Sequence, residues 1–143
     1  MNKNISEKIS ENFIINKLLK KLNFNELGSF KFENDAAYLN ISKNFKTVVT
    51  TDTIIENIDF FQNDPPESVA QKLVCTNLSD LFAMGSSPKA YTLNLSLTSK
   101  IDINWLKKFT NRLLLLQKKY NIYLLGGDIS KSKELNLTAT FFG

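Results

Sequence analysis

The 143-residue chain has a net charge of +4, and apolar residues make up 43% and charged residues 22% of it. This length suits one domain, and the composition is that of a globular protein rather than a disordered one. The sequence contains neither an apolar run of the roughly 20 residues that span a bilayer nor a secretory signal. With no histidine in the chain, imidazole catalysis and histidine-based zinc binding are excluded. Because Cys75 is the single cysteine, no internal disulfide can form, and we expect a cytoplasmic protein.

The excess of basic residues is a weak indication of nucleic-acid binding. Only Arg112 among the 18 basic residues is an arginine, whereas surfaces that grip phosphates or read bases usually use arginine. The densest basic run, from Lys107 to Lys119, lies on a predicted helix with an apolar stripe, and a solvated helix face explains it. A basic nucleic-acid-binding module is therefore the least favoured interpretation, and we expect neither a nucleic acid nor a membrane as partner.

The first half of the chain predicts two helices with a pair of strands between them. Apolar residues recur at helical spacing over residues 6–22. Residues 36–42 and 46–53 predict two strands joined by a short turn, and the second is rich in β-branched residues. Asp64 is expected to cap a helix that has proline in its first turn and ends near residue 84, before a glycine.

The second half predicts three strands and one helix. Apolar and polar residues alternate over 90–97, which is typical of a half-buried strand. Asp102 is expected to cap a helix that runs to about Tyr120, with apolar residues spaced three and four apart. A short strand is expected at 122–125, ending at a pair of glycines, and another at 135–142.

This order of elements predicts an α+β fold for one domain over residues 1–143, with helices in one layer on one face of a mixed sheet. The chain stops directly after the last predicted strand, so we also expect that it is a fragment of a longer protein.

The candidate chemistry rests on four aspartates. The glycine-rich loops of P-loop and dinucleotide-binding proteins are missing from the sequence. The candidates are Asp35, Asp52, Asp80 and Asp128, and three of the four have small or hydroxyl neighbours and adjoin apolar segments. Each alone has an ordinary explanation as a turn, cap or solvent-facing residue. Together with nearby hydroxyl groups they form a hard-oxygen set that suits magnesium, which clamps polyphosphates in many enzymes.

The same residues lie in a recognisable series of motifs: Asn34-Asp35-Ala36-Ala37, Thr50-Thr51-Asp52, Asn77-Leu78-Ser79-Asp80 followed by Ala83-Met84-Gly85, and Gly126-Gly127-Asp128. In order and approximate spacing they resemble the N-terminal domain of thiamine-monophosphate kinases, a family within the AIR synthase and selenophosphate synthetase superfamily. The resemblance covers nearly the whole chain. The reactive cysteine that selenophosphate synthetases carry near the N-terminus is missing here.

The resemblance implies a homodimer whose two sheets form a barrel, with ATP and Mg²⁺ bound near the interface and no catalytic side chain assigned. It implies these metal ligands: Asp35, Thr50, Thr51, Asp52, Asp80 and Asp128. It also implies that ATP lies against Gly127 and Asp128, and near Thr110. The expected reaction is ATP-dependent phosphorylation of thiamine monophosphate to thiamine diphosphate.

Two positions depart from the family pattern. The family usually has Gly-Asp-Asp-Ala where this chain has Glu33-Asn34-Asp35-Ala36, and a substrate-contacting histidine where this chain has Asp59. Asp59 is thus the implied residue on the substrate side, where an anion would need a proton or a metal to face a phosphorylated substrate. Two alternatives stay open. One is another ATP-dependent enzyme of the superfamily, such as AIR synthase, and the other is a non-catalytic nucleotide-binding or dimerisation domain.

Overall fold

A computed structural model describes residues 10–143 except 35, 41–43 and 45. Its sheet has four strands in the order β1-β4-β2-β3. The strands are β1 (Val49–Ile55), β2 (Ala90–Leu97), β3 (Tyr123–Lys131) and β4 (Asn136–Phe142). β4 runs antiparallel to β1 and β2, whereas β2 and β3 are parallel. The predicted α+β class with a mixed sheet is therefore confirmed. Asp35 lies outside the described residues.

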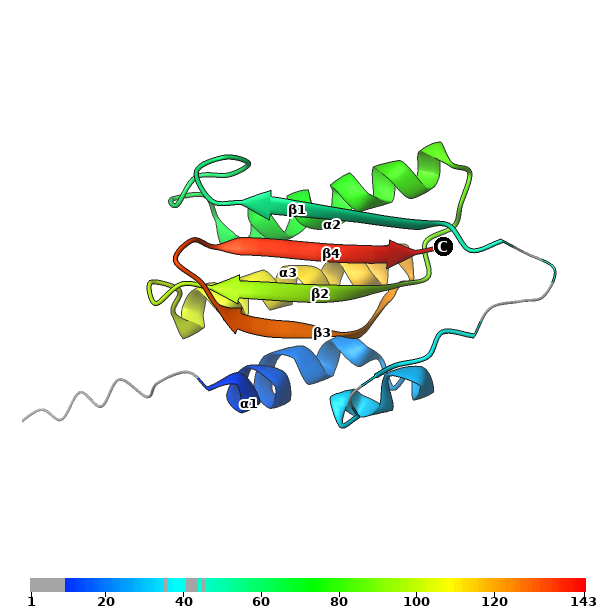
Figure 1. Ribbon diagram of the computed structural model, residues 1–143, viewed down its shortest axis with the longest axis horizontal. Coiled ribbons are helices and arrows are strands. Elements are labelled where there is room, and N and C mark those ends of the chain that lie inside the picture. The colour runs from blue at the N-terminus through cyan, green and yellow to red at the C-terminus, as the bar shows by residue number, and fades with distance from the viewer. Residues whose placement is uncertain (1–9, 35, 41–43, 45) are drawn as a thin grey trace, which may run out of the picture.

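Two long helices, α2 (Pro66–Ala83) and α3 (Ile103–Tyr120), pack against each other behind the sheet (Figure 1). The N-terminal segment contacts the outer strand β3 and lies beside it in the same view. It consists of α1 (Glu11–Ile14), η1 (Ile15–Leu19), η2 (Lys20–Asn23) and η3 (Leu27–Phe32). Within the described part of the chain, each helix is too short or too polar to cross a bilayer.

The core lies between the sheet and the helices because one face of each central strand is apolar. Leu93 and Leu95 of β2 and Phe141 of β4 are buried on this face, and the ring of Tyr91 stacks on Phe141 with centroids 4.8 Å apart. The opposite face carries hydroxyl groups that pair across strands, and these pairs are Thr51 with Thr140, Thr53 with Thr138 and Ser96 with Ser130. The sheet therefore has one apolar face and one hydroxyl-rich face.

Several predicted elements are confirmed. Strand β2 has the predicted bounds, and β4 begins one residue later than predicted. The Asp102 carboxylate accepts a hydrogen bond of 2.7 Å from the Trp105 amide and so caps α3. Helix α2 ends before Gly85, which has the positive φ of 67° that favours glycine.

Other predictions were wrong. Residues 36–40 form no strand, and the Tyr38 amide donates to the Gly28 carbonyl instead of to a ladder partner. β1 begins and ends later than predicted. Asp64 does not cap α2, because its carboxylate accepts from the Phe61 amide at 2.9 Å and Pro65 takes the capping position.

The third strand is also longer than predicted. The expected strand at 122–125 continues through both glycines to Lys131. A register shift in its pairing with β2, between Tyr91 and Thr92, absorbs one extra residue as a β-bulge. The glycines therefore lie within a strand rather than in a terminal turn.

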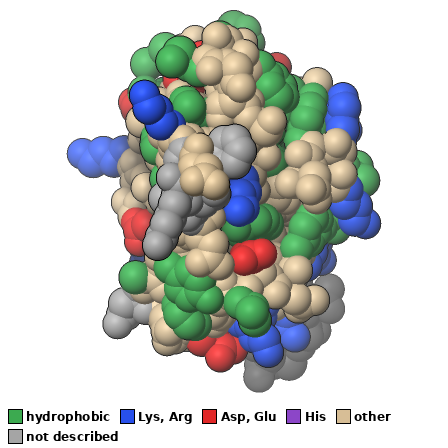
Figure 2. Space-filling view, turned by 90° about the vertical axis from the view of Figure 1, so that its right-hand side faces the viewer, with side chains coloured by type: hydrophobic (Ala, Val, Ile, Leu, Met, Phe, Trp, Pro, Cys, Tyr) green, Lys and Arg blue, Asp and Glu red, His purple; other side chains and the backbone are tan. Residues whose placement is uncertain are grey.

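Charges are mixed on the side of the molecule shown in Figure 2. Lys and Arg side chains there are interspersed with acidic and apolar ones. Between described residues one ion pair forms, from Lys20 to Glu33 at 2.8 Å. This side of the molecule thus lacks the single basic field that phosphate-backbone binding uses.

Candidate functional site

Two of the predicted aspartates meet where α2 packs on β1. Asp80 lies in the last turn of α2, and its Oδ2 accepts a hydrogen bond of 2.9 Å from Thr50 Oγ1 at the start of β1. Asp52 follows Thr50 by two residues, and side chains two apart in a strand share a face. Thr50, Asp52 and Asp80 therefore form one group, in which the charge of Asp80 acts on Asp52.

Asp52 is in an unfavourable environment for a carboxylate. Desolvation by burial raises the pKa of Asp52, and the neighbouring charge of Asp80 raises it further. Asp52 Oδ2 is buried and has no hydrogen-bond partner among the described residues. A buried carboxylate oxygen without a partner, beside a second carboxylate, is stabilised by a proton or by a cation.

Basic side chains do not supply that cation in the described part of the chain, where the ion pair between Lys20 and Glu33 is the only one. Nor do the described residues gather three or more acidic, histidine or cysteine side chains at one point. The unpartnered oxygen of Asp52 and the Asp80 carboxylate nevertheless fit a hard divalent cation such as Mg²⁺, which uses one or two carboxylates and completes its shell with water and phosphate.

Thr51 was predicted beside these residues, but its hydroxyl points to the other face of the sheet. It donates to the Ala139 carbonyl at 3.2 Å and pairs with Thr140 Oγ1 at 2.9 Å. The period of two in a strand causes this separation from Thr50. Within one chain, the Thr51 hydroxyl thus lies away from the Asp52 and Asp80 pair.

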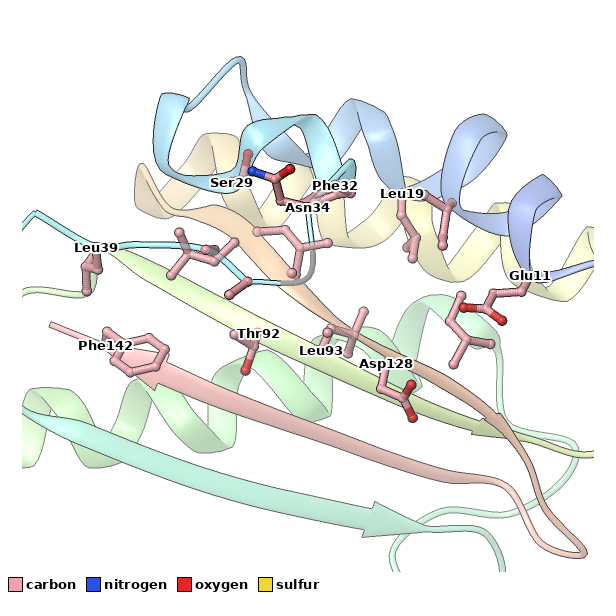
Figure 3. A pocket seen from close by; sticks show the side chains of 18 residues that line it. Glu11, Leu19, Ser29, Phe32, Asn34, Leu39, Thr92, Leu93, Asp128 and Phe142 are labelled. Atoms are coloured by element: carbon pink, nitrogen blue, oxygen red, sulfur yellow. The ribbon is translucent and has the colours of Figure 1, made fainter.

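The second predicted group lies on β3, beside a cavity of about 650 Å³ (Figure 3). Gly126, Gly127 and Asp128 line it together with residues of the N-terminal segment. Figure 3 shows the carboxylates of Glu11 and Asp128 toward one end of the cavity, and Leu39 and Phe142 toward the other. The cavity is thus acidic at one end and apolar at the other.

The two glycines have different roles in shaping this cavity. A Cβ on Gly127 would lie 1.8 Å from the Leu93 carbonyl oxygen of β2, so only glycine allows the two strands to pair here. A Cβ on Gly126 would meet no atom within 4 Å. Gly126 therefore leaves open space along the cavity wall, while Gly127 is required by the sheet itself.

The two groups of aspartates do not meet within one chain. β1 and β3 are the outer strands, and two strands lie between them, which separates them by about 14 Å at the usual strand spacing. Across the ladder Asp52 is level with Ala139, Leu93 and Gly127. Asp128, the next residue after Gly127, therefore points to the opposite face of the sheet.

Thr110 does not fit the predicted contact with nucleotide. The residue is completely buried in α3, and its hydroxyl donates to the Leu106 carbonyl at 2.8 Å. A ligand would reach it only by opening the core. This threonine satisfies its own helix, and the regular apolar spacing of α3 already placed position 110 beside the buried stripe.

Asp59 closes the turn that follows β1. Its Oδ2 accepts from the Ile55 amide at 2.8 Å, and Lys72 Nζ donates to its backbone carbonyl. The turn exposes Ile58 and Phe61, at 75% and 72% of their surface. The carboxylate is thus engaged by backbone, which the sequence pattern did not indicate.

Sequence reasoning missed Glu11 and Thr92 as cavity residues. Glu11 reads as an ordinary acidic residue in the first turn of a helix, and Thr92 as the polar half of an alternating strand. Neither pattern carries a signal for a ligand site, because the cavity forms only when the N-terminal segment packs beside β3.

The raised pKa of Asp52 yields a prediction about how the stability of the fold depends on pH. Because its pKa lies above the ordinary 3.8, the folded chain keeps a proton that the unfolded chain has lost, so stability falls as pH rises through this window. Asp52→Asn should therefore raise the melting temperature by a few degrees at pH 7 without divalent cations, with a smaller gain at pH 4. Scanning fluorimetry in EDTA measures both values.

Glu134→Gln is the matched control, because it removes one exposed carboxylate whose side chain makes no hydrogen bond with the described residues. The difference in melting temperature between this variant and the unmodified chain should be the same at the two pH values. An Asp52→Asn variant less stable than the unmodified chain at pH 7 would contradict the assigned repulsion.

Comparison with known sequences finds a family model and several thiamine-monophosphate kinases that match this chain. Residues 33–143 match the family model for AIR synthase related protein, N-terminal domain. The thiamine-monophosphate kinase of Haemophilus influenzae is 43% identical over 110 residues, which are 77% of this chain and 33% of that protein. The kinase of the same name from Buchnera aphidicola of Acyrthosiphon pisum is 36% identical over 137 residues, 95% of this chain and 42% of the other.

Solved structures of thiamine-monophosphate kinases also superpose on this chain. The thiamine-monophosphate kinase of Stenotrophomonas maltophilia superposes with a TM-score of 0.71 at 34% identity, over 78% of this chain and 34% of that one. AaThiL complexed with AMPPCP and TMP superposes with a TM-score of 0.69 at 26% identity, over 87% of this chain and 43% of that one. The hydrogenase maturation protein HypE in complex with ATP shares the fold, with a TM-score of 0.74 over 97% of this chain and 41% of that one, at 17% identity.

The chain spans about a third to two fifths of the length of these relatives. The family match covers most of the chain, and the similarity to thiamine-monophosphate kinases predicted from the motifs is confirmed. The chain belongs to the AIR synthase related proteins, as an N-terminal domain of that family.

Proposed function

We propose that this chain is the Mg²⁺–ATP-binding part of an enzyme that phosphorylates thiamine monophosphate with ATP, giving thiamine diphosphate and ADP. The observation that carries the proposal is the pair of Asp52 and Asp80, one with an unpartnered buried oxygen. The sequence identity with thiamine-monophosphate kinases and the structural similarity to AaThiL complexed with AMPPCP and TMP support the choice of reaction.

Asp52 and Asp80 would hold Mg²⁺, with Asp35 and Asp128 as further proposed ligands. When bound, Mg²⁺ neutralises negative charge on the phosphates and on the phosphoryl group in transfer. The protein's part is to fix the carboxylates on β1 and α2, two rigid elements of the fold. The acceptor is a phosphate that is already anionic, so positioning suffices and no strong base is needed.

The nucleotide would bind in the cavity beside β3. Its volume of about 650 Å³ lies within the range of about 300–1,000 Å³ for small-molecule sites. Gly126 leaves space along the wall, and apolar residues such as Leu39 and Phe142 offer contacts for a base. Asp128 and Glu11 would repel a bare triphosphate, which makes a bound cation necessary at that end.

Asp59 stays the proposed residue on the acceptor side. Because its carboxylate accepts a hydrogen bond from the Ile55 amide, Asp59 would act through the turn that carries Ile58 and Phe61. Substitution of Asp59 should therefore weaken binding of the acceptor more than it weakens binding of ATP.

We further propose a homodimer in which the hydroxyl-rich faces of two sheets form a barrel. A single chain holds Asp52 and Asp80 on one outer strand and its neighbouring helix, and Asp128 on the opposite outer strand and face. Asp128 lies on the hydroxyl-rich face, whereas Asp52 and Asp80 lie on the helix side, so the pair of one copy would approach Asp128 of the other around the edge of β1. β1 also pairs only with β4 among the described strands, so its outer edge is open to a partner strand.

The metal site predicts that ATP binding depends on Mg²⁺. Calorimetry on the 143-residue chain should give saturable ATP binding with Mg²⁺ and at least tenfold weaker binding in EDTA, since the carboxylates otherwise repel the triphosphate. Asp80→Asn should weaken binding more than Asp59→Asn, because only Asp80 is assigned to the metal. Equal affinity with and without EDTA, or the reverse order of the variants, contradicts the assignment.

The choice of substrate is tested best with a chimera, because the chain covers 33% of the Haemophilus influenzae kinase. Replacing the matching third of that kinase with this chain should give ADP release that requires thiamine monophosphate, measured in a coupled assay. Asp80→Asn in the chimera should abolish it. The 143-residue chain alone should bind ATP without this turnover.

A folded chimera that binds Mg²⁺–ATP but ignores thiamine monophosphate would contradict the substrate and favour another enzyme of the superfamily. Binding without any turnover by the chimera favours a non-catalytic nucleotide-binding domain.

The proposed barrel predicts a dimer of twice 16.3 kDa in light scattering at high micromolar concentration. Thr140→Lys, which places a charge on the hydroxyl-rich face at a position paired with Thr51, should shift the mass toward that of the monomer. A monomeric mass for the unmodified chain at these concentrations rules out the barrel as a stable assembly.

A further inference from the structure

We propose that Thr50 is a positioning residue that orients the Asp80 carboxylate beside Asp52, a role in addition to the metal ligation implied by the sequence motif. The inference rests on the proposed function, because it concerns how the chain prepares its cation site. It starts from one contact, the hydrogen bond of 2.9 Å from Thr50 Oγ1 to Asp80 Oδ2.

The direction of this hydrogen bond determines what Thr50 can do. An ionised carboxylate only accepts, and a hydroxyl has a single proton to donate. The Thr50 proton is therefore committed to Asp80 Oδ2, leaving Oδ1 and the remaining lone pairs of Oδ2 to face a cation. Thr50 thereby orients a carboxylate ligand, while its own oxygen keeps its lone pairs for the ligation that the motif implies.

Thr50 is well placed to orient a neighbour because its own position is rigid. It lies in β1 opposite Phe141 of β4, and that phenylalanine is fully buried in the core. A β-branched side chain in a strand has few χ1 rotamers. The donor is thus fixed by the sheet, which is the property that a supporting group for a ligand site requires.

Asp80, in contrast, has little else to hold it. Its side chain is exposed, and it lies in the last turn of α2, where the helix dipole disfavours a negative charge. Asp52 adds a second repulsive charge. The bond from Thr50 is the one hydrogen bond to the Asp80 carboxylate from the described residues. Without it, the carboxylate would turn away from Asp52 into solvent.

The adjacent threonine shows that the hydroxyls of this strand have separate roles. Thr51 pairs with Thr140 on the opposite face, as does Thr53 with Thr138. Only Thr50 bonds from β1 to α2 among the described threonines of this strand. A loss of metal affinity confined to position 50 would therefore follow from the Asp80 contact and not from a general loss of strand hydroxyls.

The test uses the full 143-residue chain and Mn²⁺ alone as probe, with free Mn²⁺ measured by electron paramagnetic resonance. Thr50→Val keeps the branched shape and removes the donor, Thr50→Ser keeps the donor, and Thr53→Val is the matched control on the opposite face. Thr50→Val should weaken Mn²⁺ binding about 10–100-fold, the usual effect of removing a group that orients a ligand. Thr50→Ser and Thr53→Val should stay within about threefold of the unmodified chain, well below that effect.

A double-mutant cycle separates orientation from general stability. In the Asp80→Asn background, Thr50→Val should cause a smaller loss of Mn²⁺ affinity than in the unmodified chain, because the group that it orients is gone. Equal Mn²⁺ affinity of Thr50→Val and the unmodified chain overturns the inference, as does a Thr50→Ser variant as weak as Thr50→Val. If the unmodified chain itself shows no saturable Mn²⁺ binding, the proposed metal site fails and this inference with it.

A second measurement needs no variant to fold. Three-bond couplings of the Asp80 side chain, measured by NMR on the unmodified chain without metal, should report one dominant χ1 rotamer. Couplings averaged over several rotamers would overturn the role assigned to Thr50.

Discussion

The packing of α2 on β1 forces two carboxylates to share one region of the structure. Asp52 and Asp80 reach it from different elements, and Thr50 joins these elements through its hydrogen bond to Asp80. The burial of Asp52 and the charge of Asp80 act in the same direction on the pKa of Asp52. The unpartnered oxygen supports the proposal that a cation binds here.

The sheet then determines what one chain can and cannot assemble. The two candidate groups lie at its outer strands, the carboxylate pair beside β1 and the glycine-lined cavity beside β3. The strand alternation directs them to opposite faces. A kinase must bring metal and phosphates together within contact distance, so the proposed function needs the two groups to be joined from outside a single copy of this domain, which the proposed homodimer would do at the edge of β1.

Local patterns in the sequence predicted most of the elements, but they did not predict contacts between segments that are distant in the sequence. The cap at Asp102 and the alternation of β2 depend on residues a few positions apart. The predicted strand at 36–42 failed in its described part, residues 36–40, because β propensity supplies no ladder partner. The motif that paired Thr50 with Thr51 overlooked the period of two in a strand, which was available from the sequence. The hydrogen bond from Thr50 to Asp80, thirty residues away, could not be predicted from the sequence.

The proposed metal site is tested most directly by diffraction at the manganese absorption edge, from crystals of the chain grown with Mn²⁺ and the non-hydrolysable analogue AMPPCP. An anomalous peak in direct contact with both Asp52 and Asp80, with phosphate oxygens completing the metal's shell, is the predicted result. A nucleotide bound with its phosphates elsewhere and no anomalous peak beside Asp52 and Asp80 would contradict it.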